Sequence, residues 1–297
     1  MLAFAEYKNK LFYLNWMTSE RGPLISDYGE VDIDNYENNL GLLTKIFSDV
    51  KNKTNKEESI ITYSIDRDKL LFSIDYFDPM NPSLYDWYNS QSDDQIIGKN
   101  LDSYHYPITN KKNKLLTISV PKNIRLQLKE NVRILKKRLN NLSVGIFSAE
   151  IGARVWFNAE KLKNYIIWKL GTRNNDEILY IDNKKLVSYF SISRTKKSVK
   201  LNWQYGDGAS ASMILESINS KINNKRYDKK IDKIFIYTCC GKINEIKEIE
   251  KEYKSDTLLL NPLCILESTN GKKFKKEEIY KTLALAETGN SFINIDV

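Results

Sequence analysis

The pattern of apolar and polar positions predicts that the chain opens with three short strands joined by tight turns. Turn residues at Lys8-Asn9 and Arg21-Gly22-Pro23 separate these strands, which indicates an antiparallel meander. A helix with apolar residues at helical spacing and a further strand are expected to follow. The predicted elements are strands at 2–6, 10–17 and 24–31, a helix at 38–50 and a strand at 59–65.

The next stretch has its own strands and helices and is typical of a small inserted α+β subdomain. Its best amphipathic signal is a long helix that begins at Pro121 and extends to Asn141, with apolar residues every three or four positions. Further strands are expected at 70–74, 101–107 and 115–120, with a short helix at 84–88.

The second half repeats the order of the first, which predicts an internal duplication of β-β-β-α-β-α. Its clearest part is a β-α-β unit at 233–263, whose two apolar runs flank a charged helix. The other predicted elements are a strand at 143–147, a helix at 149–157, strands at 165–170, 178–181, 186–193 and 199–203, a helix at 210–222, a helix at 276–287 and an apolar tail at 292–297.

Composition is that of a globular protein, with 41% hydrophobic and 28% charged residues among 297. No apolar run approaches the roughly 20 residues that span a bilayer, and Glu6 interrupts any signal-peptide core, so a cytosolic protein is expected. Cys239, Cys240 and Cys264 lack metal-ligand spacing and there is one histidine, so we expect no metal site.

A net charge of +8 raises the question of a nucleic-acid or membrane partner. Lysine is spread with asparagine and isoleucine through the whole chain, and the densest cluster, at 129–138, also carries an apolar helical face. We therefore expect no nucleic-acid partner and leave an anionic membrane surface open.

Catalytic residues are not apparent in the sequence. His105 lies between two tyrosines in a predicted strand, where a structural role suffices. Glu245, Glu248 and Glu252 share a helix with interspersed lysines, which is typical of a solvated face.

The duplicated order of elements resembles the actin-like, ribonuclease-H-like ATPase fold. The inserted subdomain narrows the resemblance to the FtsA cell-division and PilM type IV pilus families. The stretches that carry it are Trp87-Tyr88, Tyr104-His105-Tyr106, the strand and helix from 115 to 141, the strand and turn at 234–241, Leu260-Asn261-Pro262 and the tail at 292–295. The resemblance implies a first half at 1–66 continued at 142–160, an inserted subdomain at 67–141 and a second half at 161–297.

In this fold, acidic and glycine-rich turns after the first strand of each half hold phosphates and Mg²⁺, and a glycine turn admits the adenosine. The resemblance places Glu6 at the first turn without a glycine, and Gly171 at the second turn beside Lys169. Cys239-Cys240-Gly241 stands at the adenosine turn, where two Cβ atoms would crowd a nucleoside.

One glycine pair remains intact, at Gly206-Asp207-Gly208, where a helix-entry turn is the alternative interpretation. A degenerate nucleotide cleft would thus comprise Glu6, Gly171, Gly206, Gly208 and Gly241. We expect hydrolysis to be lost and no cofactor to be required, with residual ATP binding left open.

By resemblance to PilM, the expected function is a non-catalytic adaptor at the cytoplasmic face of the inner membrane. It would bind the short cytoplasmic segment of a bitopic protein of a pilus or secretion assembly. The alternative is a divergent ATPase or small-molecule kinase of the same fold.

Overall fold

The computed structural model describes residues 1–33, 60–76, 100–108, 114–134, 137–195, 198–222, 231–253 and 256–293. The helices predicted at 38–50 and 84–88, and most of the apolar tail, lie outside these ranges.

The first large sheet has the strand order β15-β3-β2-β1-β4-β8. Strands β1 to β3 form the predicted antiparallel meander, while β4 and β8 run parallel to β1. Its strands are β1 (Leu2–Tyr7), β2 (Lys10–Ser19), β3 (Gly22–Asp32), β4 (Ile60–Ile65), β8 (Arg138–Val144) and the short β15 (Glu267–Ser268).

The second large sheet has the order β12-β11-β10-β9-β13-β14, and β9 is again the first strand of a meander with parallel neighbours on its other side. The predicted duplication of strand order is therefore confirmed. The strands are β9 (Asn164–Leu170), β10 (Asn175–Asp182), β11 (Lys185–Arg194), β12 (Val199–Gly206), β13 (Lys233–Thr238) and β14 (Thr257–Leu259).

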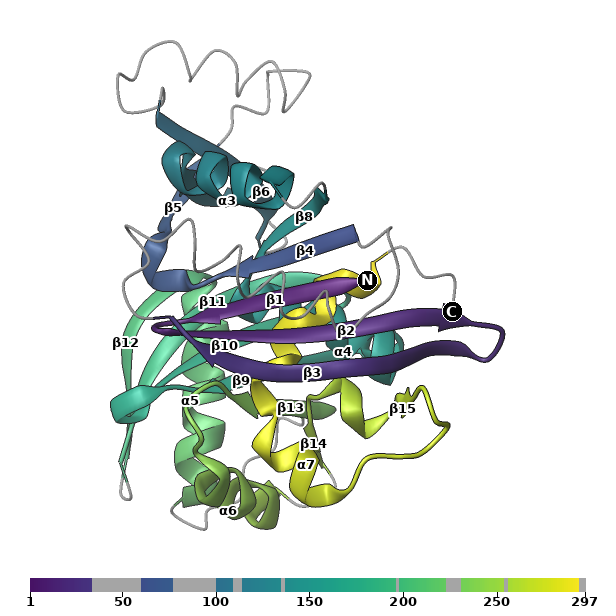
Figure 1. Cartoon of the computed structure of the whole chain (residues 1–297). Coiled ribbons are helices and arrows are strands. Elements are labelled where there is room, and N and C mark those ends of the chain that lie inside the picture. The colour runs from purple at the N-terminus through teal and green to yellow at the C-terminus, as the bar shows by residue number, and fades with distance from the viewer. Residues whose placement is uncertain are drawn as a thin grey trace.

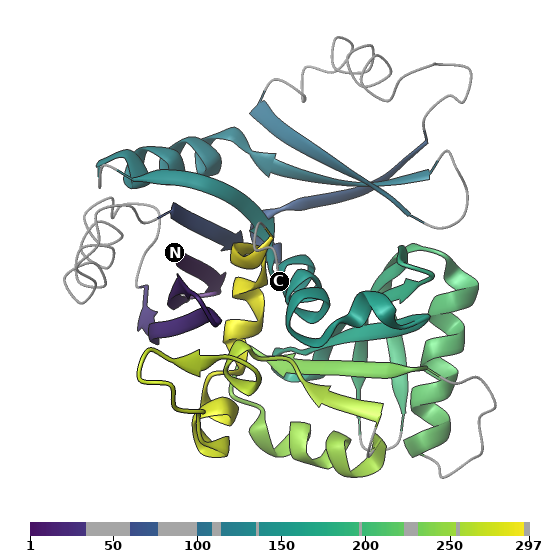
Figure 2. The same cartoon turned by 90° about the vertical axis from the view of Figure 1, so that its right-hand side faces the viewer.

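Two helical segments cross between the sheets, as Figure 2 shows in teal and yellow: α4 (Gly145–Phe157) and η8 (Leu283–Phe292). They approach closely because small residues meet at their crossing. A Cβ atom on Gly289 would lie 2.3 Å from the carbonyl oxygen of Ser148. The side chain of Ser148 also donates a 2.6 Å hydrogen bond to the backbone oxygen of Glu287. This crossing fixes η8 between the two sheets.

The remaining helices cover the outer faces, and a third sheet stands apart at the top of Figure 1. This small sheet has the order β5-β7-β6, and α3 packs beside β7 with its Leu128 and Val132 side chains buried. The elements are β5 (Leu71–Tyr76), β6 (Leu101–Pro107), β7 (Lys114–Pro121), α3 (Lys122–Ile134), α5 (Gly208–Ile222), α6 (Ile243–Tyr253) and α7 (Lys276–Lys281).

The helix predicted to extend to Asn141 ends at Ile134, and the chain continues as β8. Leu139 has the right spacing for a helix, but pairing with β4 holds it at the sheet edge, so tertiary contacts override the local pattern. The strand predicted at 143–147 was also wrong beyond Val144, because α4 begins at Gly145.

The second strand of the β-α-β unit ends at Leu259, just before the predicted Asn261-Pro262 stop. The Asn261 side chain accepts a 2.9 Å hydrogen bond from the Leu263 amide and begins a 3₁₀ turn. The last α-helix ends at Lys281 rather than Glu287, and the chain continues as η8.

Candidate functional site

The turn after β1 and the turn after β9 face each other, and side chains from the two halves join them. The Lys8 ammonium donates a 2.7 Å hydrogen bond to the Thr172 hydroxyl across this junction. The Lys8 backbone N–H donates at 2.6 Å to the Asp66 carboxylate, which follows β4. Both turns that would hold phosphates in an actin-like ATPase are thus tied to each other.

Glu6 lies on the other face of β1 from Tyr7, because side chains alternate along a strand. It is 1% exposed, forms an ion pair with Lys69 and accepts a 3.3 Å hydrogen bond from the Tyr63 hydroxyl. Burial raises the pKa of Glu6 to about 7, against the opposing effect of Lys69. The side chain facing the second half is instead Tyr7, whose ring centre is 4.8 Å from the Lys169 ammonium.

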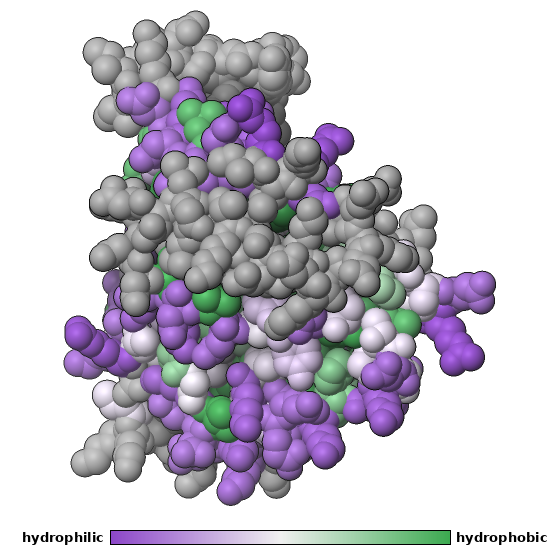
Figure 3. Space-filling model, viewed as in Figure 1, coloured by the Kyte–Doolittle hydropathy of each residue, from purple (hydrophilic) through white to green (hydrophobic). Residues whose placement is uncertain are grey.

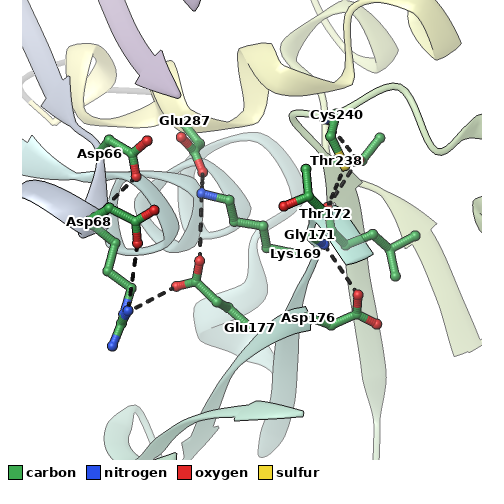
Figure 4. A network of polar contacts seen from close by, with 12 residues as sticks. Asp66, Asp68, Lys169, Gly171, Thr172, Asp176, Glu177, Thr238, Cys240 and Glu287 are labelled. Carbon is green, nitrogen blue, oxygen red and sulfur yellow. Dashed lines mark hydrogen bonds and ion pairs between the residues drawn. The ribbon is translucent and has the colours of Figure 1, made fainter. Parts of the chain in front are cut away.

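Lys169, on β9, is the centre of a buried polar cluster (Figure 4). Its ammonium lies 2.7 Å from the Glu287 carboxylate and 3.8 Å from that of Glu177. The Tyr237 hydroxyl donates a further 2.8 Å hydrogen bond to Glu287. Burial disfavours the ammonium, but the neighbouring carboxylates, Glu287 foremost, raise the pKa of Lys169 well above its usual value. Lys169 is therefore a buried cation.

Burial also raises the pKa of Glu287, and the Lys169 ammonium opposes that shift. Glu287 comes from η8, the segment that crosses between the sheets, so this ion pair connects that crossing to the second sheet. Lys169 stands where the resemblance to actin-like ATPases leads us to expect a metal-binding carboxylate. Its ammonium supplies positive charge at this position without a bound metal ion.

The cluster continues toward the first half through Glu177 on β10. Its carboxylate accepts a hydrogen bond from the Tyr189 hydroxyl and lies 3.9 Å from the Arg67 guanidinium, which follows β4. The same guanidinium stacks 3.9 Å from the centre of the Trp203 ring. Charges from both halves and from η8 thus form one contiguous network.

Gly171 is required by the turn in which it lies. A Cβ atom there would fall 1.9 Å from the Asn175 carbonyl oxygen. The Asp176 carboxylate accepts hydrogen bonds from the Gly171 amide at 3.2 Å, from the Trp168 indole at 3.1 Å and from Arg194 at 3.0 Å. The Gly171 N–H is therefore already bonded within the protein, by the Asp176 carboxylate.

Gly241 lies in the turn after β13, next to the end of β9. It has φ of +74° and nothing within 4 Å of a Cβ position, so this turn is open. Of the two cysteines expected to crowd a nucleoside here, Cys239 has its side chain buried. Cys240 remains at the turn, where its amide donates to the Thr238 hydroxyl at 3.2 Å.

The glycine pair at the start of α5 lies elsewhere, at the far edge of the second sheet, with β11 and β10 between it and β9. Asp207 caps this helix by accepting from the Ser210 amide at 2.9 Å. Gly206 has φ of +104° and its carbonyl accepts a 3.3 Å bond from Lys114 of the small sheet. Gly208 begins the helix itself.

The structure therefore brings together Gly171 and Gly241 at the ends of adjacent strands β9 and β13, but not Glu6 or the 206–208 turn. Their role in nucleotide contact stays a prediction.

Mg²⁺-ATP fits the described residues poorly. Within the described ranges no group of three or more His, Cys, Asp or Glu side chains is arranged to hold a metal ion. Glu6 and Glu287, near the two turns, are engaged by the protein's own cations, and the turns themselves are bridged by Lys8 and Thr172. The arrangement is that of a closed internal network rather than of a phosphate cradle.

Sequence reasoning missed several members of this cluster: Tyr7, Lys8, Asp66, Glu177 and Glu287. Glu177 lies at the start of an ordinary strand, and Glu287 stands at the end of a predicted helix, so neither has a pattern that marks it as buried. The one available signal was Lys169 inside an otherwise apolar strand, because a buried lysine requires a buried carboxylate.

Within the described residues, no helix is both long and apolar enough to cross a membrane.

No protein-family model matches the sequence, and no curated protein matches it. Among solved structures, the chain is similar to one described as the PilM-PilN type IV pilus biogenesis complex, with a TM-score of 0.62 and 9% identity over 99% of this chain and 98% of that one.

It also matches a Bacteroides thetaiotaomicron protein of unknown function with an actin-like ATPase fold, at a TM-score of 0.41 and 11% identity over 88% and 90% of the two chains. A third match is the cytoplasmic domain of EpsL, an inner-membrane component of the Vibrio cholerae type II secretion system, at a TM-score of 0.44 and 8% identity over 96% and 94%. The chain has the actin-like ATPase fold with a small antiparallel subdomain sheet, as the sequence predicted.

Proposed function

We propose that the protein is a non-catalytic actin-like adaptor in a type IV pilus or type II secretion-like assembly. It acts on the cytoplasmic side of the inner membrane, as a peripheral component. Its partner is the short cytoplasmic segment of a bitopic membrane protein. The likeness in fold to the PilM chain of the PilM-PilN complex supports this setting.

The observation that carries the non-catalytic part is the Lys169–Glu287 ion pair, whose atoms lie 2.7 Å apart where Mg²⁺ and phosphate chemistry would be expected. An ammonium cannot coordinate Mg²⁺, and it neutralises a carboxylate that could otherwise bind a cation. The Lys8–Thr172 hydrogen bond supports the same conclusion, since it joins the two phosphate-type turns. A fold that keeps its shape but uses these positions for internal contacts is suited to binding rather than turnover.

The alternative, a divergent ATP-binding enzyme, is favoured by one feature. The Gly241 turn is open and adopts the left-handed conformation that lets a backbone approach a ligand. The adenosine part of ATP could bind at this open turn without a metal ion.

Isothermal titration of the full chain with ATP, with and without Mg²⁺, separates the two functions. The adaptor function predicts no Mg²⁺-dependent heat and no phosphate release. Mg²⁺-dependent binding that is weakened by Gly241→Ala, together with phosphate release, would instead favour the enzyme. As a positive test, inner-membrane extracts probed with the tagged chain should yield a bitopic pilus or secretion protein, and its N-terminal cytoplasmic peptide alone should compete for binding.

A further inference from the structure

The net charge of the chain is concentrated in one short segment. Between residues 114 and 144 there are eight lysines and arginines and a single acid, Glu130, so this segment carries +7 of the chain's +8. Half of these cations lie on α3, which has four cations and one acid. The amphipathic helix α6, by contrast, has two cations and four acids. The basic character of α3 is therefore a local feature of the inserted subdomain.

The cations of α3 lie on one side of the helix, away from the side that packs into the subdomain. Residues three or four positions apart share a side of a helix. This spacing groups a basic stripe that consists of Lys122, Arg125, Lys129 and Arg133, with Leu126 among them. Lys129 and Arg133 are exposed. Leu126 is 56% exposed, whereas Leu128 and Val132 are buried on the other side of the helix.

A groove of about 590 Å³ opens beside the basic stripe, between α3 and β8. Figure 2 shows α3 lying beside β8. In Figure 3 the hydrophilic colour predominates over α3, with a hydrophobic patch among it. No carboxylate is among the described residues that line the groove. Its cations are Arg125, Lys129, Arg133, Lys137 and Arg138, so the groove extends the charge of the stripe.

Nearby acids neutralise only part of this charge. Asp102 lies 2.7 Å from the Arg125 guanidinium, and Glu130 lies 3.2 Å from that of Arg133. The second pair is exposed, so water weakens it. The described residues of the stripe and the groove provide six cations against these two acids. A larger groove of about 750 Å³ between α6 and α7 has no such excess, because Glu250 and Glu277 stand among its lysines.

Two features of this surface match an acidic membrane. Each lysine or arginine close to a surface of acidic lipids increases the affinity by about fivefold. An exposed leucine among cations gains by leaving water at the boundary between headgroups and acyl chains. Single-stranded nucleic acid is bound on aromatic side chains, whereas the stripe has none and Tyr104 is the one aromatic residue described in the groove.

We propose that α3 is a membrane-contact surface for bilayers that contain acidic phospholipids. The basic stripe lies against headgroup phosphates, Lys137 and Arg138 bind a headgroup at the groove, and Leu126 reaches the acyl boundary. The small sheet and α3 stand apart from the two large sheets in Figure 1, so α3 can meet a flat surface. The proposal rests on the proposed function for its setting at the inner membrane, and it adds a direct lipid contact to attachment through a bitopic partner.

The first test needs no variant and uses flotation of the full chain with vesicles. One set consists of phosphatidylcholine alone, and the other has about one third phosphatidylglycerol. We expect at least about tenfold tighter binding to the acidic vesicles. Raising the salt from about 0.1 M to about 0.5 M should remove most of this binding, because the interaction is screened.

Matched variants then place the contact on α3. Lys129→Gln with Arg133→Gln removes two exposed cations of the stripe and should weaken binding to acidic vesicles at least about tenfold. Lys272→Gln with Lys273→Gln, on an exposed loop near β15, changes the net charge equally and should leave the affinity within about twofold. Circular dichroism melts confirm that both variants fold.

A second pair of variants tests the apolar contact. Leu126→Ser should weaken binding to acidic vesicles by about fivefold and leave its salt dependence unchanged, because no charge is lost. Leu201→Ser, at an exposed leucine of β12, is the control and should bind as wild type does.

Equal binding to neutral and acidic vesicles, or an equal loss in both lysine-containing variants, would overturn the proposal. Tighter binding of a single-stranded oligonucleotide than of acidic vesicles would also overturn it and assign the surface to nucleic acid. If the bitopic partner is recovered but acidic vesicles are not bound, the adaptor function stands and the lipid contact fails. If acidic vesicles are bound as expected but no bitopic partner is recovered, the adaptor function fails and the lipid contact stands.

Discussion

Replacing Lys169 by methionine tests whether the buried ion pair, rather than packing, holds the centre of the molecule. Methionine keeps most of the volume of the lysine side chain and removes its charge. Glu287, 1% exposed and 2.7 Å from the lost ammonium, then keeps the hydrogen bond from Tyr237, but no other cation of the described residues forms an ion pair with it. Removing one partner of a buried pair typically costs about 3–5 kcal/mol, because the other charge is left uncompensated.

The variant can limit this loss by burying Glu287 in its protonated form. Protonating a carboxyl group with an ordinary pKa of about 4.3 costs about 3.7 kcal/mol at pH 7 and only about 1 kcal/mol at pH 5. The pKa of Glu287 in the folded variant lies above its unfolded value, so the variant gains stability relative to wild type as the pH falls. The wild-type pKa of Glu287 is itself raised, so wild type gains part of the same stability, and we expect the destabilisation to shrink by up to about 2.7 kcal/mol between pH 7 and pH 5.

Urea unfolding followed by tryptophan fluorescence, at pH 7 and pH 5, measures both quantities. Lys185→Met, at an exposed lysine of β11, is the control and should change the free energy of unfolding by less than about 0.5 kcal/mol. The double variant Lys169→Met with Glu287→Gln removes both charges and should be more stable at pH 7 than Lys169→Met alone. A loss below about 1 kcal/mol, or one that does not depend on pH, would show that packing rather than the ion pair holds this region.

Three further predictions concern single residues of the turns. Gly171→Ala should lower the free energy of unfolding by more than about 2 kcal/mol, because its Cβ would lie 1.9 Å from the Asn175 carbonyl oxygen. Gly241→Ala, in open space at φ of +74°, should lower it by about 1 kcal/mol. Thermal melts should show the larger loss for Gly171→Ala. Because the folded pKa of Glu6 is raised to about 7, its ionisation lowers stability as the pH rises from about 4.5 to 7, and Glu6→Gln should remove up to about 3 kcal/mol of that fall; identical pH profiles for variant and wild type would contradict this. Asp207→Ala should cost about 1 kcal/mol through loss of the α5 cap, measured by urea unfolding, and a neutral result would show that the cap is dispensable.

The small-sheet subdomain and the β8 edge show where local pattern was insufficient. Apolar spacing placed the strands of both meanders and the helices α5 and α6 with little error, because those elements bury one face at a regular period. Leu139 fits a helical period as well as a strand, and only pairing with β4 decided between them. Near the C-terminus, one predicted helix is instead α7 followed by the 3₁₀ segment η8. The close crossing of η8 with α4 is a tertiary contact that the local pattern does not contain.

The order of elements, the duplication and hence the actin-like fold follow from the sequence alone, because hydrophobic periodicity and turn residues are local properties. The localised charge of 114–144 is also present in the sequence, since it is a count and needs no coordinates. Folding in three dimensions was needed to show that Tyr7 rather than Glu6 faces the second half, that Lys169 pairs with Glu287, and that the basic residues line one groove. Lys169 and Glu287 are 118 positions apart in the chain. Local sequence patterns cannot predict which distant side chain will pair with a buried charge, because that pairing depends on the tertiary fold.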